Sequence, residues 1–258
     1  MSDRVLDLQI DVPGTPEQVW EAIATGPGVS AWLHPTEIEE RTGGTFTFDM
    51  GAGPVTGDVT AYEPPRRIVQ EVSWRSTLDG PEGRLATEWI VEARDGGTCT
   101  VRMVTRGFGS GHDWDAELEG FSESMTTALE TLRLHLTHFG GTAGGRFKAF
   151  GAAPGPLDEG WAALTAALGV ADATEGTRVE ADGNGTPRLA GVVERAFTGR
   201  RRRDLHLRLT EPAPGIATVS IFGEAGATLV QGFLYGDEGA AAAARAQPEW
   251  ETWMRERF

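Results

Sequence analysis

One continuous apolar stripe runs through residues 113–139 and limits the folds open to this chain more than any other feature. Its apolar residues recur at steps of three or four, which is typical of an amphipathic helix, here of about seven turns. A helix of that length is too long for a small domain unless it lies across a whole sheet. The stripe consists of Trp114, Leu118, Phe121, Met125, Leu129, Leu132, Leu136 and Phe139.

The preceding segment, residues 38–108, predicts that sheet. Apolar and polar residues alternate there in short runs separated by Gly- and Pro-containing turns, which indicates an antiparallel meander. Before it, residues 5–12 alternate like a strand, and Thr15, Pro16 and Gln18 predict a capped helix start. Residues 28–33 predict a second helical turn. The order of strand, short helices, meander and long helix is that of an α+β helix-grip fold.

The second half of the chain repeats the opening. Residues 12–23 (VPGTPEQVWEAI) align without gaps with 153–164 (APGPLDEGWAAL), so that Trp20 falls on Trp161. Residues 62–74 also resemble 210–222 with one residue removed. We therefore predict an internal duplication, with a domain at 1–140 and a diverged, shortened copy at 141–258. Gly140-Gly141 and Gly144-Gly145 suggest a flexible boundary, and the copy's strands are expected near 189–197, 203–210, 215–223 and 227–235, before a helix from about 237.

Charge and composition exclude several classes of protein. The net charge is −15, and residues 1–140 alone carry 10 basic and 23 acidic side chains, so binding to nucleic acid is not expected. The single Cys excludes an internal disulfide and a Cys-rich zinc site. Without an apolar stretch long enough to span a membrane, and without a signal-peptide pattern, we expect a cytoplasmic protein. The sequence carries no motif for a catalytic set or a cofactor.

The first half resembles the START-like (SRPBCC) superfamily and, within it, the family related to the activator of heat-shock-protein-90 ATPase. The resemblance covers about residues 3–140 and rests on TPEQVWEAI at 15–23, Trp32-Leu33, the strand entry at 43–46, Gly57 and residues 64–69 leading to Trp74, Trp89, and the closing helix. It implies a sheet curled around the C-terminal helix with a hydrophobic cavity between them. Related members bind lipids, sterols, polyketides or hormones, and a few act as cyclases or aromatases.

Nine residues are the candidate ligand-binding set. Eight lie on the inward strand parity, the short helix or the apolar stripe, where they either line a pocket or simply fill the core. His34 follows the short helix, a place that borders the cavity entrance in the family; an ordinary surface role is the alternative. The set is Trp32, His34, Phe46, Phe48, Trp74, Trp89, Phe108, Phe121 and Met125.

The remaining candidates have simpler structural interpretations. Asp113, after His112, is expected to be a helix N-cap. The pair His135 and His138 lacks further metal ligands, and Cys99 is expected in the core. Two clusters complete the set: the carboxylates Asp113, Asp115, Glu117 and Glu119, which complement the helix dipole, and the basic run Arg200 to Arg203, expected as a solvated loop or as a contact for an anion or an acidic partner.

Three functional hypotheses follow. The first is a non-catalytic protein that binds a small hydrophobic molecule in the front-half cavity, with the rear copy serving stability or assembly. The second is a cyclase- or hydrolase-like enzyme using His34, or Arg102 and Arg106, beside the same cavity. The third is a co-chaperone-like interaction module with a protein partner, or a homodimer, suggested by the family and the acidic front half. No cofactor or metal is expected in any of them.

Overall fold

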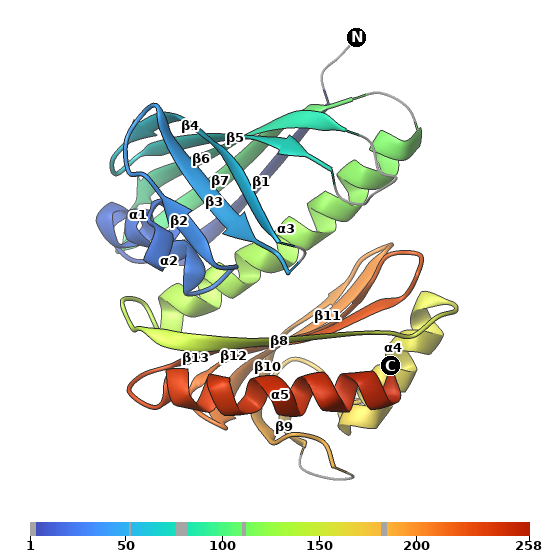
Figure 1. Ribbon diagram of the computed structural model, residues 1–258. Helices are drawn as coiled ribbons and strands as arrows, with labels where there is room; N and C mark the ends of the chain where they lie inside the picture. Colours follow the sequence, from blue (N-terminus) through green and yellow to red (C-terminus); the bar gives the residue numbers. More distant parts are fainter. Residues whose placement is uncertain (1–3, 52, 76–81, 110–111, 182–184) are drawn as a thin grey trace. The chain divides into compact units, whose positions relative to one another are not determined.

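The computed structural model describes residues 4–51, 53–75, 82–109, 112–181 and 185–258. The chain divides into two compact units, Met1–Gly141 and Thr142–Phe258, called here the first and second domains. Each combines one antiparallel sheet with helices, so the architecture is α+β and the helix-grip fold occurs twice (Figure 1).

The first domain is a seven-stranded sheet with one long helix beside it (Figure 1). Its strands follow the order β1-β7-β6-β5-β4-β3-β2, so the first and last strands of the domain pair with each other. The elements are β1 (Arg4–Pro13), α1 (Pro16–Ala24), α2 (Gly26–Ser30), β2 (Thr36–Ile38), β3 (Gly44–Asp49), β4 (Pro54–Glu63), β5 (Arg67–Trp74), β6 (Gly83–Arg94), β7 (Thr98–Phe108) and α3 (His112–His138).

The start of α1 follows the predicted cap. The Thr15 hydroxyl accepts a hydrogen bond from the Gln18 amide at 3.3 Å, and the Gln18 side chain accepts one from the Thr15 amide at 2.9 Å. Pro16 occupies the first helical position, where no intrahelical N–H is required. The helix then buries Val19, Trp20 and Ile23 against the sheet core.

The second domain repeats this arrangement with one strand fewer. Its six strands follow the order β8-β13-β12-β11-β10-β9, and its described residues form no counterparts of α2 and β2. The elements are β8 (Gly144–Ala152), α4 (Leu157–Leu168), β9 (Arg178–Ala181), β10 (Leu189–Thr198), β11 (Arg202–Glu211), β12 (Gly215–Phe222), β13 (Ala227–Tyr235) and α5 (Gly239–Arg257).

The two parts of the sequence repeat differ in what they match. In the first part, Gly14 and Gly155 both adopt positive φ, 123° and 122°, between the first strand of a domain and its helix. In the second part, 62–74 forms β4 and β5, whereas 210–222 forms the end of β11 and β12. The two sheet orders, aligned from β1 and β8, match β5 with β11 and β4 with β10. The sequence alignment of 62–74 with 210–222 is wrong because a strand, a Pro turn and a strand make a local pattern that any hairpin of a meander can carry.

The predicted flexible boundary at Gly144-Gly145 is also wrong, because both glycines lie inside β8. A Cβ on Gly144 would stand 1.9 Å from the Leu234 carbonyl oxygen, and one on Gly145 would stand 2.7 Å from the Ala240 Cα of α5. These glycines therefore allow close packing of strand and helix. Strands β8 and β9 were not identified from the sequence.

The interiors of the two domains are filled differently. In the second, Trp250 and Trp253 of α5 enter the core at 0% and 2% exposure, and Trp250 stacks on Phe147 with ring centroids 5.9 Å apart. In the first, α3 contributes Leu129 and Leu132 to the core together with its partly buried neighbours Phe121 and Met125. Among the described residues, no helix is long and apolar enough to cross a membrane.

Candidate functional site

A cavity of about 130 Å³ lies inside the first domain. Its lining comes from α1, α2 and the segment after them, from the inner face of the sheet, and from α3. Four of its members, His34, Thr36, Gln70 and Thr87, are polar, and the others are apolar or aromatic. The full lining is Ile23, Val29, Trp32, Leu33, His34, Thr36, Phe46, Phe48, Met50, Gln70, Val72, Trp74, Leu85, Thr87, Trp89, Met103, Phe121 and Met125.

The structure brings together most of the residues expected to bind a ligand. Eight of the nine line this cavity, while Phe108 does not. Phe108 is buried and packs edge-on against Trp114 and Phe121, with ring centroids 6.2 and 5.7 Å away, so it supports the wall from behind. Whether the other eight hold a ligand stays a prediction.

Several residues of the lining were not predicted from the sequence, including Gln70, Val72, Leu85, Thr87 and Met103. All five lie on β5, β6 or β7. They share the strand parity of Trp74, Trp89 and Val101, because side chains two residues apart point to the same face of a sheet. That parity could be predicted from the alternation of apolar and polar residues. The aliphatic and polar residues of the lining were missed because only aromatic residues of this parity were considered.

Buried tryptophans form the rigid part of the wall. Trp32 is 1% exposed, and its indole N–H donates a 2.8 Å hydrogen bond to the Ala22 carbonyl oxygen. Its ring meets that of Trp89 edge to face, with centroids 6.4 Å apart. Because Trp32 is held both by a hydrogen bond and by an aromatic contact, it cannot turn away from the cavity without breaking both.

His34 lies in the wall with a defined orientation. Its ring stacks on Phe48, with centroids 5.0 Å apart, and its Nδ1 is 3.1 Å from the Thr36 hydroxyl oxygen. That hydroxyl donates to the His34 carbonyl oxygen at 2.9 Å. Since the single hydroxyl proton is used there, Nδ1 carries a proton and donates to Thr36.

Trp74 lines the cavity and is tied to α3. Its indole N–H donates to a Glu117 carboxylate oxygen at 2.6 Å, and its ring meets Phe121 edge to face at 5.5 Å. Glu117, expected only to complement the helix dipole, therefore also positions a wall residue. Another member of that carboxylate cluster, Asp115, pairs with Arg4 at 2.6 Å. The predicted cap at Asp113, with His112, lies outside the described side chains.

The arginines proposed for catalysis lie away from the cavity. Arg102 forms a salt bridge with Asp7, and Arg106 with Glu88 at 3.4 Å. Their side chains are 41% and 53% exposed. They alternate along β7 with Met103, which lines the cavity, so they point to the opposite face of the sheet. The expectation that Arg102 or Arg106 acts beside the cavity is wrong.

Cys99 is a core residue, as predicted. It is 0% exposed, its thiol donates to the Gly14 carbonyl oxygen at 3.4 Å, and burial raises its pKa. A thiol in this state is a poor nucleophile. Among the described residues, no three His, Cys, Asp or Glu side chains come close enough to hold a metal ion.

His135 makes stability depend on pH. Burial lowers the pKa of its imidazole from 6.5 to about 4. Between these two pH values the folded state binds fewer protons than the unfolded state. The stability that depends on a neutral His135 is therefore complete above pH 6.5 and declines toward pH 4. We expect a loss of about 3 kcal/mol in the free energy of unfolding over this range.

The measurement is denaturant unfolding at several pH values for the native chain and for His135→Gln. Carboxylates titrate in the same range, so the difference between the two curves isolates the histidine. The native chain should lose stability more steeply as the pH falls. Parallel curves would show that His135 does not resist protonation in the fold.

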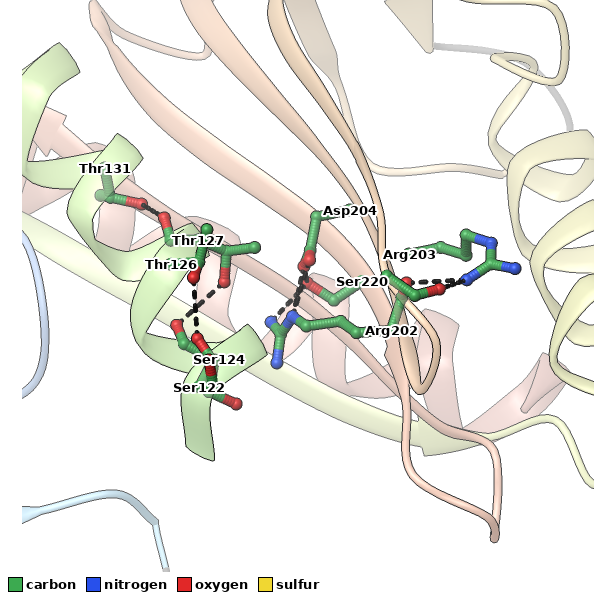
Figure 2. Close-up of polar contacts among 10 residues, drawn as sticks. Ser122, Ser124, Thr126, Thr127, Thr131, Arg202, Arg203, Asp204 and Ser220 are labelled. Carbon is green, nitrogen blue, oxygen red and sulfur yellow. Dashed lines mark hydrogen bonds and ion pairs between the residues drawn. The ribbon is translucent and has the colours of Figure 1, made fainter. Parts of the chain in front are cut away.

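The basic run Arg200 to Arg203 is only partly the solvated loop expected. Arg202 opens β11, is 8% exposed, and donates to both Asp204 carboxylate oxygens at 2.9 and 2.6 Å (Figure 2). Arg203 pairs with Asp158 at 2.8 Å and Arg201 with Glu224 at 3.2 Å. The solvated-loop expectation is wrong for Arg202, because its guanidinium pairs with Asp204, a buried carboxylate two residues along the same strand.

The first domain has a helix-grip fold with a largely apolar cavity lined by its sheet and helices. Residues 13–137 match the family model of the Activator of Hsp90 ATPase homolog 1-like protein. The resemblance carried by the sequence is thereby confirmed for this domain.

Solved structures resemble one or both domains. A protein of Mesorhizobium loti is 19% identical and matches 53% of this chain and 98% of its own, with a TM-score of 0.48. The di-domain ARO/CYC BexL of the BE-7585A biosynthetic pathway is 15% identical over 98% of this chain and 95% of its own, at 0.47. DynU16 of the dynemicin biosynthetic locus is 17% identical over 98% and 96%, at 0.45. No curated protein matches the sequence. Likenesses of this order do not identify a substrate.

Proposed function

We propose that the first domain binds a small, neutral, largely apolar molecule in its internal cavity. The observation that carries this proposal is a partly open cavity walled by Trp32, Phe46, Phe48, Trp74 and Trp89, with few polar groups. Concave, mostly apolar sites with a few placed polar groups are typical of small-molecule binding.

The volume limits the size of the occupant. At about 130 Å³, the cavity is close to an engineered protein cavity of about 150 Å³ that takes up benzene. A body of one or two rings therefore suits it without rearrangement. Met50 is the most exposed residue of the lining, at 39%, and thus marks the side of the cavity nearest solvent.

The absence of charge in the lining favours a neutral ligand. Of the described residues that line the cavity, His34 alone has a titratable side chain. A carboxylate brought into such a site would lose its hydration without gaining a cation, which is costly. The net charge of −15 adds general repulsion.

The same composition favours binding over catalysis. Acid and base chemistry relies on positioned titratable groups at the reacting atoms, and the lining supplies only His34.

A role as a protein-interaction module is supported less well than ligand binding. The large hydrophobic residues exposed in the described part of the chain are single residues in separate segments: Val5 in β1, Met50 after β3, and Phe150 in β8. Docking surfaces are contiguous patches.

Naphthalene tests the proposal, because it is neutral, apolar and of suitable size. We expect equilibrium dialysis against the full chain to show saturable binding of one molecule per chain. Decanoate at the same concentrations should not compete. Absence of saturable naphthalene binding would contradict the proposal.

A variant that fills the cavity locates the site. Val72→Trp adds bulk inside the cavity, and we expect it to weaken naphthalene binding by about tenfold or more. Ser73→Trp is the matched control, since Ser73 is the exposed neighbour on β5 and points to the other face. Leu85→Phe, also in the lining, serves as a second filling variant if Val72→Trp unfolds. Equal loss with Ser73→Trp would place the ligand elsewhere.

A further inference from the structure

A row of three polar side chains crosses the inner face of the first sheet. Gln70 of β5 pairs in register with Thr87 of β6, and Thr87 pairs with Thr105 of β7. On either side along these strands, the inward residues are apolar, among them Val72 and Leu85. The row thus forms a polar band in an otherwise apolar surface.

The two threonines share a hydrogen bond whose direction follows from burial. Their hydroxyl oxygens lie 3.0 Å apart. Thr105 is 0% exposed, and within the described part of the chain this is its only side-chain hydrogen bond. If Thr87 were the donor, the Thr105 proton would be buried without an acceptor, which is unfavourable. Thr105 therefore donates, and the proton of the Thr87 hydroxyl is left for the cavity that Thr87 lines.

Gln70 places a second donor beside it. Its side chain lines the cavity and is half-buried, and its amide makes no hydrogen bond with any other residue the structure describes. Directly opposed residues in an antiparallel pair have Cβ atoms about 5 Å apart, so the Gln70 amide and the Thr87 hydroxyl reach a common point. Two N–H or O–H donors aimed at one point match the two lone pairs of a carbonyl oxygen.

We propose that Gln70 and Thr87 form a subsite for the carbonyl oxygen of a neutral aryl ketone, with Thr105 as the positioning residue that orients the Thr87 hydroxyl. This inference rests on the proposed function and specifies its ligand class. The aromatic wall holds the ring body, and the polar band holds the oxygen. A carboxylate does not satisfy the site, because the lining contains no cationic side chain.

The test compares 1-tetralone with tetralin, the same ring system without the carbonyl, in equilibrium dialysis with the full chain. The free energy of transfer from water differs between the two molecules, so their affinities cannot be compared directly. The readout is therefore the change in each ligand's affinity that a substitution causes. We expect Gln70→Met, and separately the double variant Thr87→Val with Thr105→Val, to weaken 1-tetralone binding by about tenfold. Tetralin binding should stay unchanged or become tighter. The double variant removes both hydroxyls and leaves neither one unpaired.

A matched control comes from the same sheet. Thr47 and Thr56 form a similar hydroxyl pair at 2.9 Å between β3 and β4, with Thr56 exposed and Thr47 half-buried outside the cavity lining. Replacing both with valine should alter neither ligand's binding. Thermal unfolding of every variant checks that the fold is retained.

The outcomes separate the two proposals. If the native chain binds tetralin and naphthalene but the substitutions leave 1-tetralone binding unchanged, or weaken both ligands equally, the subsite is overturned while the binding function stands. If the native chain binds none of the three molecules, the proposed function fails and the subsite fails with it.

Discussion

Replacing Trp32 with alanine is expected to lower the free energy of unfolding of the first domain by about 3–5 kcal/mol, the range found when a buried aromatic side chain is truncated. The indole is 1% exposed, bonds to the Ala22 carbonyl oxygen at 2.8 Å, and contacts Trp89 edge to face. Alanine removes all three contributions. The substitution also enlarges the existing cavity, so the neighbouring residues cannot easily repack to fill it.

Denaturant unfolding followed by hydrogen exchange of individual segments measures this loss and assigns it to a domain. Trp32→Phe is the control, since it keeps an aromatic body but leaves the Ala22 carbonyl without the indole N–H. We expect it to cost about 1–3 kcal/mol. A loss below about 1 kcal/mol for the alanine variant would show that α1 and α2 repack around the gap.

Replacing Asp204 with alanine is expected to destabilise the second domain by about 3–5 kcal/mol. Asp204 is 0% exposed and accepts hydrogen bonds from Arg202 and from the Ser220 hydroxyl (Figure 2). Figure 2 shows the guanidinium directed at the carboxylate from the same strand, with Ser220 beside them. Removing the carboxylate takes a direct ion pair away from a guanidinium that is 10% exposed.

The paired substitution separates loss of the interaction from the cost of the charge left behind. Arg202→Met with Asp204→Leu removes both charges and should recover most of the lost stability. Glu224→Ala provides the surface control, because Glu224 is 86% exposed in its pair with Arg201. We expect that change to cost less than about 1 kcal/mol. If Asp204→Ala and Glu224→Ala lower the free energy of unfolding equally, the buried Arg202–Asp204 pair stabilises the domain no more than a surface pair does.

Local features of the first domain were predictable because their causes are local. The Thr15, Pro16 and Gln18 cap needs only neighbouring residues, and it is present as expected. The stripe at 113–139 corresponds to α3, His112–His138. Strand parity depends only on alternation, and it placed Trp74 and Trp89 on the inner face correctly.

Errors arose where a local pattern has more than one tertiary meaning. Gly144 and Gly145 look like a linker, yet they lie in β8, where only the packing of α5 explains them. Arg202 looks solvated within a run of four arginines until Asp204 is found buried beside it. Phe108 has the strand parity of the outward Arg106, yet it is buried, because a register shift between β1 and β7 lies between these two residues. It packs on Trp114 and Phe121 and does not line the cavity.

The sequence by itself determined the helix-grip order, its duplication, and the inward aromatic face of the first domain, since periodicity and capping act over a few residues. Only the tertiary structure decided that a cavity remains between those aromatic residues and that Gln70, Thr87 and Thr105 lie in one row across three strands. Strand register is decided by pairing across the sheet. Core packing is decided by the volumes of side chains from distant segments. Residues 18 positions apart, such as Thr87 and Thr105, therefore become hydrogen-bonded neighbours only in the folded domain.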